Sequence, residues 1–75
     1  MDKFTRLRNE MYAIAERIPE HNRVVRVLVS TIRTTIASAE AYELADNTLR
    51  ASILLDRVRG YMVELNDLAN EFTGK

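Results

Sequence analysis

The first part of the chain alternates apolar and charged residues with the period of an amphipathic helix. Its apolar residues are separated by three and four positions in turn: Phe4, Leu7, Met11, Ile14 and Ile18. This is heptad spacing, as in a coiled coil, and it gathers the apolar side chains in one narrow stripe. We therefore predict a helix over residues 2–18 that packs through one side only.

A proline marks the end of this first helix. The residue before a proline is pushed out of the α region, so Ile18 should leave the helix. Pro19 itself suits the first position of the next helix, where its missing N–H costs nothing. We therefore expect a tight turn, with the first two helices as neighbours.

Residues 19–45 are predicted to form the second helix, although their composition favours a strand. Between Val24 and Ile36 the sequence reads VVRVLVSTIRTTI, and most of these residues are β-branched. No other segment offers a partner strand, however, and on a helical wheel the apolar residues fall in one arc of roughly 200°. Such a wide arc is covered from two sides, so we expect this helix to be central.

The third predicted helix covers residues 48–72. Its apolar residues are spaced by four and three: Ala51, Leu55, Val58, Met62, Leu65, Ala69 and Phe72. This regular stripe is typical of a helix that packs along its whole length.

The boundary between the second and third helices is predicted at residues 46–48, Asp-Asn-Thr. These residues suit turns and helix caps, but no glycine or proline occurs there, so one continuous helix stays open as an alternative. We favour a break, because in a continuous helix Glu43 would fall inside the apolar arc. There it would need a partner such as Arg57 or Arg8, whereas at a helix end it would be exposed to water.

These segments predict an all-α fold, a three-helix antiparallel bundle that forms a single domain over residues 1–75. The first helix, about 25 Å long, is too short to cover two helices of about 40 Å. A chain this small has a marginal core, and it contains no cysteine and one histidine, His21, for which we expect a surface or capping role. We therefore expect a second copy to dock at the uncovered end and give a helical-bundle homodimer.

Several apolar residues lie off the stripes or in the wide arc, and we expect them to contact a second copy or another protein. These interface candidates are Tyr12, Val29, Ile36, Leu49, Ile53 and Val63. Apolar surface that a small chain cannot bury is typical of an interaction site. Isolated exposed apolar residues, which are common in monomers, are the alternative interpretation.

The net charge is zero, but the charged residues are unevenly distributed along the chain. Residues 1–37 carry seven Lys/Arg and four acids, whereas residues 38–75 carry four and seven. Arg23, Arg26 and Arg33 share the polar side of the second predicted helix and form a candidate nucleic-acid face. A solvated face, or salt bridges to the acidic third helix, would explain them equally. Because a pI near 6.6 is low for a nucleic-acid binder, this function is our second hypothesis.

Enzyme motifs are absent from the sequence. It has no glycine-rich phosphate loop, no nucleophile elbow and no pair of histidines, so we predict no catalytic residue, cofactor or metal. Neither a signal peptide nor an apolar run of the roughly 18 residues that a membrane span needs is recognisable. We therefore predict a non-enzymatic, cytoplasmic adaptor, regulator or inhibitor that acts through helix surfaces. A ligand or enzyme site formed between subunits is the weakest alternative.

Overall fold

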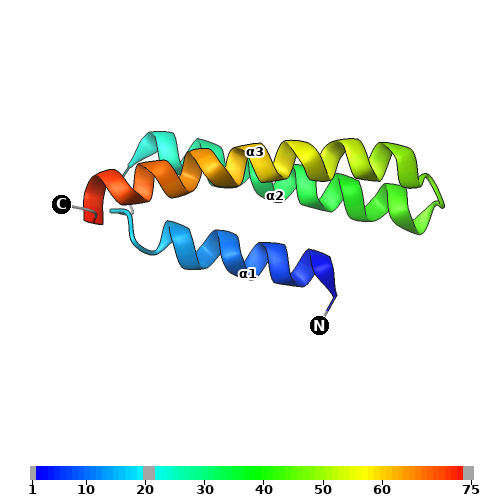
Figure 1. The fold of residues 1–75 in the computed structure, drawn as a ribbon, viewed down its shortest axis with the longest axis horizontal. Helices are drawn as coiled ribbons and strands as arrows, with labels where there is room; N and C mark the ends of the chain where they lie inside the picture. The colour runs from blue at the N-terminus through cyan, green and yellow to red at the C-terminus, as the bar shows by residue number, and fades with distance from the viewer. Residues whose placement is uncertain (1, 20–21, 74–75) are drawn as a thin grey trace.

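The computed structural model describes residues 2–19 and 22–73, and these contain three helices and no strand. Helix α1 covers Lys3–Ala15, α2 covers Arg23–Leu44 and α3 covers Thr48–Thr73. The two long helices α2 and α3 lie side by side in opposite directions, and α1 lies along one side of this pair, antiparallel to α2 (Figure 1). The predicted all-α architecture with three helices is confirmed.

One hydrophobic core runs between the three helices. The largest fully buried side chains come from all of them: Met11, Ile32, Ile36, Val58 and Leu65. Within the described residues no polar or charged side chain is buried. Burying an aliphatic side chain contributes about 1.5–3 kcal/mol, whereas the propensity penalty of a β-branched residue in a helix is below about 0.7 kcal/mol. Packing therefore outweighs the strand preference of α2.

Short polar side chains cap the N-termini of α1 and α2. The carboxylate of Asp2 accepts a hydrogen bond from the backbone N–H of Thr5 at 2.8 Å, and this bond lowers the pKa of the Asp2 carboxyl. The side chain of Asn22 accepts in the same way from the N–H of Val25 at 3.1 Å. Each cap satisfies an N–H group that has no partner within its own helix.

The connection between α1 and α2 is longer than predicted. Helix α1 ends at Ala15, where the N–H of Ile18 donates to the Ala15 carbonyl and tightens the last turn (3.0 Å). Pro19 lies outside α2, which begins at Arg23 behind its Asn22 cap, so the predicted bounds at residues 18 and 19 were wrong. A helix that began at Pro19 would have Ile18 at its N-cap, and isoleucine has no side-chain acceptor, whereas Asn22 satisfies a helix N–H. The expectation for the single histidine lies outside the described residues.

The predicted break between the long helices is confirmed. Asp46 has a φ of 62°, in the left-handed region, and its N–H donates to the Glu43 carbonyl at 3.0 Å. The N–H of Asn47 donates to the Tyr42 carbonyl at 2.8 Å. These two bonds form a Schellman motif, which ends a helix without leaving its last carbonyls unpaired. The Asn47 side chain then accepts from the N–H of Arg50 and starts α3.

Two ion pairs join α1 to the second half of α2. Glu43 is 2.6 Å from the ammonium group of Lys3, and its side chain is 37% exposed. Arg8 instead donates to Glu40 at 2.7 Å. Glu43 thus lies at the end of α2 and is partly exposed to water, as the favoured break implied. It pairs with Lys3, because the N-terminus of α1 reaches α2 close to its end, and not with the Arg57 or Arg8 that a buried Glu43 would have needed. Such partly exposed pairs stabilise a fold by at most about 1 kcal/mol each, so they orient α1 more than they hold it.

The pair of long helices extends beyond α1 at the α2–α3 turn, as the helix lengths predicted (Figure 1). Leu44 and Leu49 lie near that turn and are 83% and 72% exposed. This end is thus one place where apolar surface stays uncovered.

We predict that Asp46→Gly raises the free energy of unfolding by about 0.5–1 kcal/mol, because glycine adopts the left-handed conformation without a Cβ clash. Asp46→Val should lower it by about 1 kcal/mol or more, since a β-branched residue tolerates this conformation poorly. Urea unfolding followed by circular dichroism measures both values. The control is Ala37→Gly inside α2, expected to cost about 1 kcal/mol. Equal destabilisation by Asp46→Gly and Ala37→Gly would contradict the prediction.

Candidate docking groove between α1 and α2

The structure distributes the predicted interface residues over separate surfaces. Tyr12 and Val29 line a groove between α1 and α2. Leu49 and Ile53 line a second hollow, at the end of the molecule that α1 leaves uncovered. Val63 is exposed on α3. The sequence could not predict this division, because it depends on which side of the long pair α1 occupies.

Ile36 is the exception among the predicted interface residues. It is fully buried in the core of the chain itself, as are Ile32 and Ala39 on the same side of α2. The wide apolar arc of α2 is filled here by contacts with α1 and α3. Ile36 is therefore not available to a partner.

The path of α1 creates the groove. The ion pairs of Lys3 and Arg8 orient the first half of α1 towards α2. Arg17, just beyond the other end of α1, donates instead to α3: to Asn70 at 2.7 Å and to Thr73 at 3.2 Å. Helix α1 therefore runs from α2 towards α3, and its second half leaves a space beside the first half of α2.

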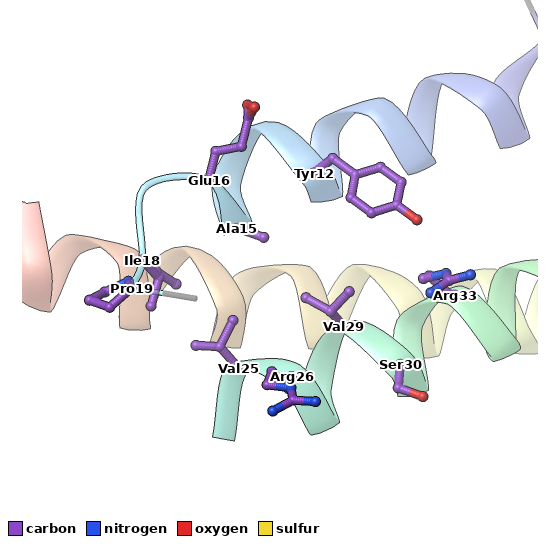
Figure 2. A pocket seen from close by; sticks show the side chains of 10 residues that line it. All are labelled: Tyr12, Ala15, Glu16, Ile18, Pro19, Val25, Arg26, Val29, Ser30 and Arg33. Carbon is purple, nitrogen blue, oxygen red and sulfur yellow. The ribbon is translucent and has the colours of Figure 1, made fainter. Parts of the chain in front are cut away.

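The floor of this groove is apolar. Val25 and Val29 point from α2 towards α1, and the side chains of Tyr12 and Ala15 face them from the other side, whereas Glu16 points away (Figure 2). The space has a volume of about 430 Å³. It is open to solvent, so it suits side chains of a docked segment better than an enclosed small molecule.

Two arginines lie along the α2 side of the groove. Arg26 and Arg33 are seven residues apart, about 10 Å along the helix axis, and both are exposed. Neither forms an ion pair or side-chain hydrogen bond with another described residue. The salt bridges to α3 that the charge asymmetry allowed are thus not formed by these arginines, whose charges stay available.

The predicted basic face is only partly continuous with the groove. Arg23 is exposed and lines a neighbouring hollow together with Arg26 and Val27. The structure therefore brings Arg26 and Arg33 together with Tyr12 and leaves Arg23 outside. From the sequence alone, the interface candidates and the arginines were predicted as two unrelated sets. The spacing of these residues could have linked the two sets. Val29 is three residues after Arg26 and four before Arg33, so the three are neighbours on one face of a helix.

No protein-family model, curated protein sequence or solved structure matches this chain. Within residues 2–19 and 22–73, no group of three or more His, Cys, Asp or Glu side chains could hold a metal ion. A search of the same residues finds no helix with both the length and the apolar character that a membrane crossing needs.

If the groove arginines have no structural role, Arg26→Gln and Arg33→Gln should each change the free energy of unfolding by less than about 0.5 kcal/mol. Ile32→Ala, on the buried side of the same helix, should cost about 2–5 kcal/mol. Urea unfolding of the three variants makes the comparison. A loss of 1 kcal/mol or more (on the order of a lost buried hydrogen bond) for either arginine would show that it serves the fold.

Proposed function

We propose that this protein is a small, non-enzymatic interaction module that binds an acidic amphipathic segment of a partner protein in the α1–α2 groove. The observation that supports this is an apolar floor beside two arginines that have no partner within the described residues. The protein would act as an adaptor, regulator or inhibitor by covering the bound segment.

The groove favours a helical segment with a particular pattern. Apolar residues one turn apart would contact Val25, Val29 and Tyr12, as in other cases where an amphipathic helix lies in a groove. Acidic residues two turns apart on the same helix would face Arg26 and Arg33, which have that spacing. Charge-assisted hydrogen bonds to carboxylates would then fix the register of the segment.

A non-enzymatic role is proposed because the groove pairs no nucleophile with a base. The side chains of Tyr12, Glu16 and Ser30 form no hydrogen bonds with one another, whereas nucleophilic catalysis relies on such a pair. We also propose a cytoplasmic location, because a chain without cysteine suits a reducing compartment.

Nucleic-acid binding is the second candidate. Arg23 adds a third cation to Arg26 and Arg33 on one helix, and a phosphate backbone is recognised mainly by such cations. Against it stand the neutral net charge and the apolar floor, which a phosphate backbone would leave unused. An acidic peptide uses both the floor and the arginines, so we favour it.

A displayed library of amphipathic helices, with its polar positions randomised, tests the proposal. Selection against the wild-type protein should enrich Asp or Glu at positions seven residues apart. Fluorescence anisotropy should then show about tenfold weaker binding to the Arg26→Gln/Arg33→Gln variant, because two exposed ion pairs contribute about 1.4 kcal/mol together. Arg59→Gln, on α3, is the matched control and should bind like the wild type.

Selected peptides without acidic enrichment, or with equal affinity for the double variant, would contradict the proposal. Labelled single- and double-stranded oligonucleotides are measured in the same assay. If they bind more tightly than the selected peptides, with an affinity that falls steeply with salt, nucleic-acid binding replaces peptide binding as the function.

A further inference from the structure

We propose that two copies of this chain pair in an antiparallel manner along one edge of α3, the edge turned away from α1. This inference goes beyond the binding function proposed above, because it concerns another surface and neither uses nor covers the α1–α2 groove. Four charged residues, seven positions apart, follow this edge: Arg50, Arg57, Glu64 and Glu71. All four are exposed.

The charges along this edge are ordered by sign. Arg50 and Arg57 lie in the first half of α3, and Glu64 and Glu71 lie in the second half. None of the four forms an ion pair with another described residue, and the guanidinium group of Arg50 lies 5.9 Å from the centroid of the Tyr42 ring. The edge therefore carries a charge pattern that its own chain leaves unused.

This pattern is complementary to itself in one arrangement. When two α3 helices run antiparallel, Arg57 of each copy faces Glu64 of the other, and Arg50 faces Glu71. Both pairings share one midpoint, between Gly60 and Tyr61, so a single two-fold axis forms all of them together. A parallel pairing in register would place like charges opposite one another and is disfavoured.

Apolar residues beside the charges agree with the same axis. Leu54, Tyr61 and Leu68 also follow one another at intervals of seven and are only partly buried against the core. The midpoint of Leu54 and Leu68 is Tyr61, half a residue from the midpoint of the charge pairs. Leu54 of one copy therefore lies near Leu68 of the other, and the two Tyr61 rings lie close to the axis. The edge thus combines a heptad apolar row with matching charges, as antiparallel coiled coils do.

The exposed side chain of Ile53 would also contact the other copy in this arrangement. About the same axis, Ile53 faces Leu68 of the other copy. In each copy Leu68 and Tyr61 line a hollow together with Val24 and Val27 of α2, two valines that are 62% and 61% exposed. Each Ile53 would therefore enter the hollow of the other copy and cover its valines.

Gly60 allows the two helices to approach closely at the axis. Apart from the adjacent residues and the backbone of its own helix, a Cβ atom placed on Gly60 would have no atom within 4 Å, so this position is open on the outside of α3. A bulky side chain there would separate the two helices, whereas glycine or another small residue lets their backbones come near each other.

Charge reversal tests the pairing. Wild-type protein should reach twice the chain mass of 8.6 kDa in sedimentation equilibrium as its concentration rises. Glu64→Arg/Glu71→Arg gives an all-basic edge and Arg50→Glu/Arg57→Glu an all-acidic edge. Each variant alone should associate about a hundredfold more weakly, because four attractive pairs become repulsive. An equimolar mixture should associate again, since every pair then joins opposite charges.

The groove variant Arg26→Gln/Arg33→Gln is the matched control and should associate like the wild type. Because it alters the groove and not the α3 edge, it distinguishes failure of this pairing from failure of peptide binding. Circular dichroism checks that each variant keeps its helices. A wild-type chain that stays at its monomer mass would overturn the proposal. So would charge variants that associate as well as the wild type, or a mixture that associates no better than its components.

A cross-linking experiment gives an independent result. Because the chain has no cysteine, Gly60→Cys introduces a single thiol beside the axis. A short bis-maleimide should link two such chains but not two Ala37→Cys chains, whose thiol lies on α2. Equal linking of both variants, or none with Gly60→Cys, would contradict the proposed axis.

Discussion

The packing of Phe4, Met11 and Ile18 on the α2–α3 pair is the contact on which the rest of the structure depends. Two long helices alone would leave one side of their shared apolar surface in water, and these three side chains, seven residues apart, cover it. Because the row is narrow and α1 is short, it can follow only one line across the pair. Ion pairs with α2 at one end, and hydrogen bonds from Arg17 to α3 at the other, set that line. The groove beside α2 is a consequence of this oblique path.

Both proposed surfaces exist because α1 is too short to cover the whole α2–α3 pair. The groove exists where α1 leaves α2, and the α3 edge exists because no helix covers the other side of the long pair. Each surface places apolar residues beside charges that form no ion pair with another described residue. The two lie on different sides of the molecule, so a dimer through α3 would present two grooves.

Much of this fold could be predicted from the sequence, because it depends on local periodicity. The stripe of α1, the break after α2 and the extent of α3 all follow from spacing or turn chemistry. The prediction failed where other contacts decide: Asn22 rather than Pro19 sets the start of α2, and Ile36 is buried. The pairing of Lys3 with Glu43 could not be predicted, because it depends on where α1 meets α2. The candidate site was harder to predict than the fold. Its residues could each be recognised in the sequence, but Tyr12 lies next to the arginines only because of the path that α1 takes.

The wholly apolar core has a consequence for how the long helices are aligned. Many helical bundles use a buried polar side chain to fix how far one helix is shifted along another, because an unpaired polar group resists sliding. The described part of this chain has no such group between α2 and α3, and rows that repeat every seven residues would match again after a shift of two turns. The alignment is therefore set by the turn around Asp46, whose hydrogen bonds fix the length of chain between the helices. The length of this turn thus determines how far α3 is shifted along α2. Residues inserted into it would allow the two helices to pack in a second alignment, shifted by two turns.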